Sequence, residues 1–225
     1  GNLSTPVYLD NHSTTQCDPE VLDHMLPYFS ERYGNAASRT HRFGFEAKAG
    51  VELARQQIGD LIGCSPKEVV WLSGATEANN LALRGAAEGM ASNGRHIIIS
   101  QIEHKSIIDT ADYLESEGWK VTRIAPNSDG IVPAQEMIDA ITSETTVVSL
   151  MLANNEIGTL QPIHAVGAAC RANGTVFHVD AVQAAVDSET ADQGVEVLCF
   201  AGAISCIAGL PTLSDQTFAK AISLH

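Results

Sequence analysis

The chain has 225 residues, 44% of them hydrophobic and 18% charged, which is enough apolar material for a sizeable globular core. Its formal net charge of −14 argues against nucleic acid as a main partner, because a phosphate backbone requires clustered lysine and arginine. The five cysteines are odd in number and irregularly spaced, which is typical of reduced, intracellular cysteines, and the N-terminus shows no secretory signal pattern. We therefore expect a cytoplasmic protein.

The first 65 residues show helical signals only. Asp18 followed by Pro19 is a strong helix start, since aspartate accepts from free backbone N–H groups and proline fits the first helical turn. A second helical period runs over residues 45–63. We expect this segment to pack beside the rest of the chain within a single domain spanning residues 1–225.

From about residue 67 onward, short apolar strands alternate with helices. The expected strands are 68–73, 96–100, 120–125, 145–152, 176–180 and 195–200. The expected helices are 76–90, 106–118, one opened by Pro133 at its first turn, and one near 163–172. Continuous apolar strands separated by helices predict an α/β fold of three layers, with a mostly parallel sheet covered on both faces.

One stretch, between Glu196 and Asp215, has no charged side chain. It is barely long enough to cross a bilayer and contains Gly202, Gly209 and Pro211, so we expect it to be buried in protein and expect no membrane contact.

In sheets of this kind, ligands bind beyond the carboxyl ends of the strands. The stretch Ser73–Asn80 follows the first strand, and its small residues and the start of the next helix form a plausible phosphate cradle. The same stretch is equally compatible with a simple helix cap made by Ser73 or Thr76.

Further polar residues follow the later strands. His104 comes after the second strand, and a lone histidine there is more often structural than functional. Residues 153–159 form a polar turn with two amides and an acid. His178 and Asp180 share one face of their strand, so they could hold a metal with His104 as third ligand, or Asp180 could bind a protonated ring nitrogen.

Taken together, these segments resemble the cysteine desulfurases, which are pyridoxal 5'-phosphate (PLP) enzymes of the class V aminotransferase group with the aspartate-aminotransferase-like fold. The resemblance runs in chain order over roughly residues 7–200 and is carried by YLDNHSTT (8–15), GNAAS with His41 (34–41), SGATEANNLALRG (73–85), Glu103-His104, NNEIGTLQPI (154–163) and HVDAVQA (178–184). It implies that this chain corresponds to the large PLP-binding domain of the family, without the small C-terminal domain.

The resemblance also implies a role for each matching residue. Ala75 and Thr76 would lie in the phosphate cradle. His104 would stack on the pyridine ring, and Asp180 would pair with the ring nitrogen. Gln183 would bond the phenolic oxygen, and Asn155 would lie near the ring and the substrate carboxylate.

The family pattern breaks at its lysine, whose amine binds the cofactor covalently. The matching segment runs from Phe200 to Ile204, with Ala203 at the histidine position and Ile204 at the lysine position. Lys105 and Lys220 are the only conceivable substitutes, and neither stands at a matching position.

The sulfur-accepting loop cysteine has no match either. Cys199 and Cys206 are not in the corresponding loop, and Cys206 reads as a small buried hydrophobe.

Three hypotheses follow. The first is a truncated cysteine desulfurase relative that has no catalytic residue and binds PLP non-covalently at best. The second is a module that binds a phosphate-bearing small molecule or regulates by pairing with a homologue; the family resemblance implies a homodimer. The third and weakest is a metal-dependent hydrolase using His104, His178 and Asp180.

Overall fold

The computed structural model describes residues 6–11, 13–183, 197–200 and 204–207, the last two segments as backbone strands. The chain divides into two compact units, Gly1–Gln57 and Ile58–His225, and the boundary falls within one long helix. No helix among the described residues is long and apolar enough to cross a membrane.

The first unit is helical. It contains α1 (Pro19–Met25), α2 (Pro27–Ser30) and most of α3 (Arg42–Ile62). The side chain of Asp18 accepts from the backbone N–H of Glu20 at 2.8 Å, and Pro19 occupies the first turn, so the predicted helix start is confirmed. Pro27 cannot continue α1 because it has no backbone N–H, and it begins α2 instead.

The second unit alternates strands and helices, as predicted. Its strands are β1 (Val69–Trp71), β2 (His96–Ser100), β3 (Lys120–Ile124), β4 (Thr145–Ser149), β5 (Val176–Asp180), β6 (Val197–Phe200) and β7 (Ile204–Ile207). Its helices, after the end of α3, are the short 3-10 turn η1 (Pro66–Glu68), α4 (Ala75–Gly89), α5 (Lys105–Ser116), α6 (Ala134–Ala140) and α7 (Ile163–Asn173). Pro133 is the residue before α6 rather than its first turn.

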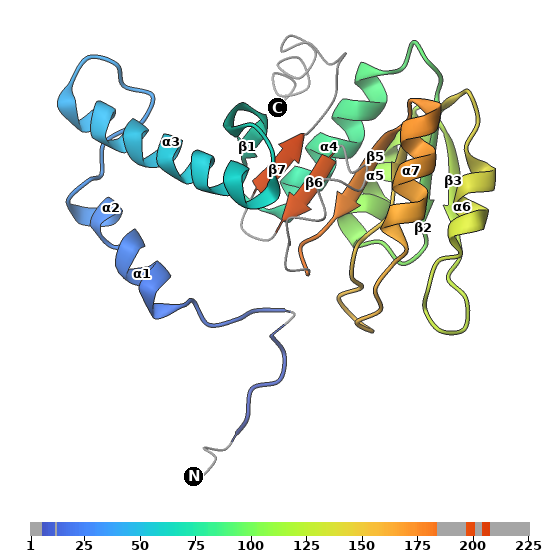
Figure 1. Cartoon of the computed structure of the whole chain (residues 1–225), viewed down its shortest axis with the longest axis horizontal. Coiled ribbons are helices and arrows are strands. Elements are labelled where there is room, and N and C mark those ends of the chain that lie inside the picture. Colours follow the sequence, from blue (N-terminus) through green and yellow to red (C-terminus); the bar gives the residue numbers. More distant parts are fainter. Residues whose placement is uncertain (1–5, 12, 184–196, 201–203, 208–225) are drawn as a thin grey trace. The chain divides into compact units, whose positions relative to one another are not determined.

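The strands form one sheet in the order β1-β7-β6-β5-β4-β2-β3 (Figure 1). The pairs β2–β3, β2–β4, β4–β5 and β5–β6 are parallel, whereas β7 runs antiparallel to both of its neighbours, β6 and β1. It follows that β1 runs in the same direction as β6. The carboxyl ends of β1, β2, β4, β5 and β6 therefore lie at one edge of the sheet, which is where we look for a site.

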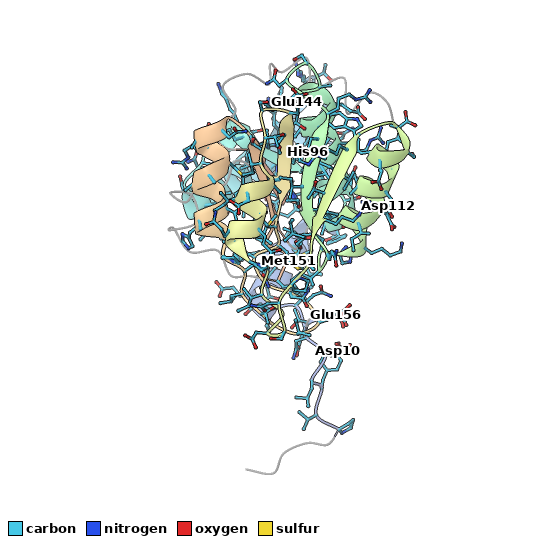
Figure 2. The ribbon with its side chains drawn as sticks, turned by 90° about the vertical axis from the view of Figure 1, so that its right-hand side faces the viewer. Asp10, His96, Asp112, Glu144, Met151 and Glu156 are labelled. Atoms are coloured by element: carbon cyan, nitrogen blue, oxygen red, sulfur yellow. The ribbon has the colours of Figure 1, made fainter. Side chains whose placement is uncertain are left out.

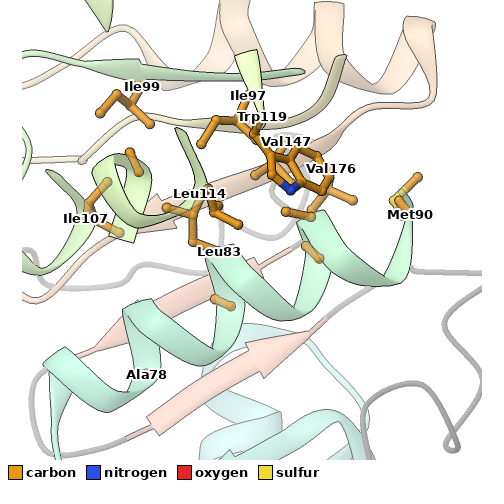
Figure 3. Packing of buried hydrophobic residues seen from close by; sticks show 14 residues of the cluster. Ala78, Leu83, Met90, Ile97, Ile99, Ile107, Leu114, Trp119, Val147 and Val176 are labelled. Carbon is orange, nitrogen blue, oxygen red and sulfur yellow. The ribbon is translucent and has the colours of Figure 1, made fainter. Parts of the chain in front are cut away.

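Each face of the sheet has its own apolar layer. On one face, Leu83 of α4 and Leu114 of α5 pack against alternate residues of the strands, including Ile97 and Val147 (Figure 3). On the other face, the intervening strand residues pack against helices α6 and α7, and this layer contains Ile98, Val148, Phe177, Met137 and Val166. Because side chains alternate along a strand, this division gives three layers and confirms the predicted fold class.

The antiparallel strand β7 was not predicted. The sequence interpretation ended the strands at Phe200 and assigned Ile204 to a loop, but Ile204 is the first residue of β7 and pairs with Phe200 and Trp71. The run Ile-Ser-Cys-Ile has the alternating, β-branched character of a strand. It pairs on one side with β6, which ends only four residues before it begins, and on the other side with β1, which is distant in the chain. Ala203 lies outside the described residues.

Candidate functional site

The edge formed by the strand ends carries a buried polar network centred on Asp180, the last residue of β5. Asp180 and His178 lie on the α4–α5 face of the sheet, because Phe177 and Val179 lie on the other face. Asp180 is 5% exposed, and its two carboxylate oxygens accept from different donors. Val182 N donates to Oδ1 at 3.1 Å, and Asn79 Nδ2 donates to Oδ2 at 2.8 Å.

Asn79 connects three elements at this edge. It lies in the second turn of α4 and is fully buried. Its amide nitrogen donates to Asp180 at the end of β5 and to Ser106 Oγ, in the first turn of α5, at 3.0 Å. The sequence motif SGATEANN included Asn79, but its role was not predicted, since nothing in the local pattern shows that it spans 101 residues to reach Asp180.

The network continues from Ser106 to His104. His104 precedes α5 as its N-cap, and its Nδ1 accepts from the backbone N–H of Ser106 at 3.1 Å. Ser106 Oγ lies 2.8 Å from the same nitrogen. Because Nδ1 accepts, a neutral His104 carries its proton on Nε2. His104 therefore has the structural role that a lone histidine often has, and its exposed ring is also joined to Asp180 through Ser106 and Asn79.

The start of α4 lies at the same edge. Ala75 and Thr76 are the first two residues of this helix, Gly74 is its N-cap, and the cap makes no side-chain hydrogen bond. The carboxylate of Glu77 instead accepts from both the backbone N–H and the hydroxyl of Ser73, each at 2.6 Å. Neither Ser73 nor Thr76 caps the helix, so the simple capping interpretation was wrong, and no described hydrogen bond uses the N–H groups of Ala75 and Thr76.

His178 is held inside the sheet. It is 1% exposed, and its Nδ1 lies 2.8 Å from Ser149 Oγ, the side chain of its register partner on β4. Burial lowers the pKa of His178 to about 4, although the nearby Asp180 carboxylate acts to raise it. His178 is therefore neutral at neutral pH and does not supply a cationic partner to Asp180 on the same strand.

A second acid, Glu103, is buried between β2 and β4. It is 5% exposed, and its Oε1 accepts from Ser100 Oγ at 2.7 Å and from Met151 N at 2.9 Å. Burial raises the pKa of Glu103 to about 7, the two hydrogen bonds act in the opposite direction, and the Asp180 charge adds to the increase. The sequence interpretation used Glu103 only as a marker of the family.

The turn at residues 153–160 is organised by Asn154. Its side-chain oxygen accepts from the N–H groups of Glu156 and Ile157, and its amide donates to the carbonyl of Ile102 at 3.0 Å. The neighbouring Asn155 is half-buried in this turn, and the half-buried Gln183 follows the end of β5. All six predicted cofactor residues thus follow β1, β2, β4 or β5 at the same edge, while the ligand contacts of Asn155 and Gln183 stay predictions.

Figure 2 shows the two ends of the sheet in one view. His96 and Glu144 lie toward one end, and Met151 and Glu156 lie toward the other. The polar network belongs to the Met151 end, because Met151 N contacts Glu103 and the adjacent Leu152 N donates to the carbonyl of Asp180 at 2.9 Å.

The part of the chain that the structure describes offers no metal-ligand cluster. Among the described residues no three histidine, cysteine, aspartate or glutamate side chains are arranged to hold a metal ion. His178 bonds Ser149 and His104 bonds Ser106, so the predicted set of His104, His178 and Asp180 does not form a ligand cluster.

Comparison with known proteins identifies the family. Residues 7–203 match Aminotransferase class-V. The chain therefore belongs to the class-V aminotransferase family. It is 47% identical over 197 residues to the cysteine desulfurase IscS of Psychromonas ingrahamii, covering 87% of this chain and 49% of that protein. It is 48% identical over 179 residues to the mitochondrial cysteine desulfurase of Drosophila melanogaster, covering 80% of this chain and 39% of that protein.

Solved structures agree with this assignment. A NifS-like protein superposes with a TM-score of 0.85 at 35% identity, covering 90% of this chain and 59% of its own. The chain spans about half the length of the curated relatives that it matches. The family resemblance stated from the motifs is thus confirmed.

Proposed function

We propose that this chain is a cysteine desulfurase-like domain that binds PLP non-covalently and does not turn over cysteine. The observation that carries the proposal is the Asp180 network: a buried carboxylate, held by Asn79 and Val182, stands at the same sheet edge as the free N–H groups that begin α4. A carboxylate has about four acceptor positions, so two donors leave room for a ring N–H. The donor set therefore fits the cofactor.

Each group would hold a different part of the cofactor. The backbone N–H groups of Ala75 and Thr76, with the Thr76 hydroxyl, would bind the phosphate at the positive end of α4. Asp180 would bind the pyridine nitrogen, and the exposed ring of His104 would cover the face of the pyridine. Asn155 and Gln183 would bond the remaining polar atoms. When bound, PLP supplies an electron-withdrawing ring.

The lack of turnover is proposed from the missing amine. Ile204, which the motif resemblance places at the position of the family lysine, begins a strand and has no amine, and only residues 201–203 join β6 to β7. Lys105 is exposed and its Nζ lies 2.6 Å from Asp109 Oδ2 one turn along α5. Lys220 lies outside the described residues.

The test is a titration with PLP followed by borohydride reduction and peptide mapping. We expect saturable binding that Asp180→Asn and Thr76→Val weaken, and no stable covalent adduct. Lys105→Ala serves as the matched control and should bind PLP like the unaltered chain. A stoichiometric adduct on Lys105 or Lys220 would overturn the proposal of non-covalent binding, and no saturable binding would overturn the proposal of a PLP site.

We also propose that the chain pairs with a second copy or a homologue. The support is the apolar surface of the first unit, where several large side chains are exposed, among them Leu9 at 86% and Phe29 at 74%. Isolated monomers rarely expose so many large apolar groups in one short segment. Gel filtration should give a dimer, and a monomer at micromolar concentration would contradict this part of the proposal.

A further inference from the structure

Glu103 is a buried acid that none of the proposed cofactor contacts uses. Its Oε1 receives both hydrogen bonds, from Ser100 at the end of β2 and from Met151 after β4, so this oxygen joins the carboxyl ends of two neighbouring strands. Its Oε2 is buried and has no hydrogen-bond partner among the described residues. A buried polar atom without a partner is costly, and such atoms are concentrated where a proton or a ligand is held.

The backbone after β4 places this acid beside Asp180. Two consecutive N–H groups contact these two residues: Met151 N donates to the Glu103 carboxyl, and Leu152 N donates to the backbone carbonyl of Asp180. Asp180 has a donor on each carboxylate oxygen, whereas Glu103 has donors on one oxygen only. The better-solvated carboxylate is the one that keeps the negative charge. The raised pKa of Glu103, about 7, agrees with this division of charge.

The other titratable groups near Glu103 do not neutralise it. On β5, His178 is neutral because burial lowers its pKa to about 4. At the start of α5, His104 accepts hydrogen bonds at Nδ1, and Lys105 pairs with Asp109 at the surface. The segment after β4 contributes only uncharged side chains, from Ser149 to Leu152, and α4 contributes the uncharged Asn79. The carboxylate of Asp180 is therefore the nearby charged group that affects the ionisation of Glu103.

We propose that Glu103 is a proton-holding positioning residue of the Asp180 site: it stays protonated while Asp180 is the only anion, and it releases its proton when a cationic group binds Asp180. The release breaks the O–H bond of the Glu103 carboxylic acid, leaves the electron pair on the carboxylate and transfers the proton to the buffer. The ligand that triggers release is a protonated aromatic nitrogen or a similar monocation. For PLP, this inference rests on the proposed function.

The first experiment needs no ligand. Carbon-13 NMR of the full chain with labelled glutamate follows the Glu103 carboxyl as the pH is raised, and Glu103→Gln identifies its signal. We expect titration near neutral pH, and we expect Asp180→Asn to shift the midpoint to lower pH by roughly one unit or less, because this change removes the charge that a cation would neutralise. The exposed Glu144, near the other end of the sheet (Figure 2), supplies the control variant Glu144→Gln, which should leave the midpoint unchanged. A Glu103 that titrates near the ordinary value, or an Asp180→Asn midpoint that does not move, would overturn the inference.

The second experiment counts protons. Calorimetric titration with PLP near neutral pH, in buffers of different ionisation enthalpy, should show more proton release for the unaltered chain than for Glu103→Gln, by a measurable fraction of one proton. Equal release by both would overturn the release step. If PLP binds neither variant, the proposed PLP function fails and so does its release step, whereas the Asp180→Asn shift still tests the coupling between the two acids.

Discussion

Asn79 is the residue whose removal most directly tests the buried network. The change is Asn79→Ala, which deletes the donor to Asp180 Oδ2 and the donor to Ser106 Oγ. A buried hydrogen bond to a charged group contributes about 1.5–3 kcal/mol and one to a neutral group about 1 kcal/mol. The Oδ1 atom of Asn79 is buried without a partner among the described residues, which is itself unfavourable. Deleting this atom therefore offsets about 1 kcal/mol of the loss in stability. We expect a net loss of about 2 kcal/mol in the free energy of unfolding.

The measurement is urea unfolding followed by circular dichroism and tryptophan fluorescence. The matched control is Gln135→Ala, because Gln135 makes the same amide-to-carboxylate bond, to Asp139 at 2.8 Å, on the exposed surface of α6. There the expected loss is below about 0.5 kcal/mol, as is usual for surface substitutions. A second variant, Asn79→Asp, places one carboxylate against another and should be more destabilising at neutral pH than at acid pH. The reasoning fails if Asn79→Ala costs no more than Gln135→Ala.

Three further effects are expected. Glu103 is neutral in the folded chain up to about pH 7 but ionises above 4.5 when unfolded, so by itself it contributes a loss of about 3 kcal/mol as pH rises through this window. Glu103→Gln should therefore gain stability relative to the unaltered chain as pH rises, and a difference between the two that does not change with pH would contradict it. His178 resists protonation, so by itself it contributes a loss of about 3 kcal/mol as pH drops from 6.5 to about 4. In the same assay His178→Gln should gain stability relative to the unaltered chain as pH drops, and a constant difference would count against it. Leu83→Ala in the α4–α5 layer should cost about 2–5 kcal/mol in urea unfolding, whereas Leu61→Ala, at an exposed position, should cost far less, and equal losses would refute the assigned core.

The two pH effects have opposite signs and overlap. Between about pH 4.5 and 6.5 the loss from Glu103 on raising the pH is offset by the gain from His178, so the unaltered chain should show a flatter stability profile than either variant. Over this range both Glu103 and His178 are neutral in the folded chain.

The local sequence pattern was sufficient to predict most of the helices and strands. The strands at residues 96–100 and 176–180 have the predicted bounds, because short runs rich in Ile, Val and Phe that follow a glycine turn leave little ambiguity. The helix start at Asp18 and Pro19 was equally clear. The strand β7 was missed because the family resemblance assigned residues 201–204 to a loop. Of its two partners, β6 immediately precedes it, whereas β1 lies far away in the chain and leaves no local signal.

The location of the candidate site at the strand ends could be predicted from the sequence, but the contacts between its residues could not. The residues predicted to bind the cofactor lie at or after the carboxyl ends of strands that meet at one edge, so the order of elements alone brings Thr76, His104 and Asp180 to that edge. The residues that join them, Asn79 and Ser106, were not predicted. Their bonds span 27 and 101 residues, and only the packing of α4 and α5 on the sheet determines which side chains meet.

Residues that are bonded within the chain and residues that are exposed at the strand ends differ in what their variants can report about ligand binding. Asn79 and Ser106 are buried and bonded within the chain, so they stabilise the fold whether or not a ligand is ever bound, and their presence alone does not require a function. Thr76 is exposed at the start of α4, and no described hydrogen bond uses its hydroxyl within the chain. Thr76→Val should leave the free energy of unfolding within about 0.5 kcal/mol of the unaltered chain, as for other surface changes. The same variant should weaken PLP binding, because it removes a phosphate donor. A loss of stability without a loss of binding would mean that this helix start serves the fold and not a phosphate.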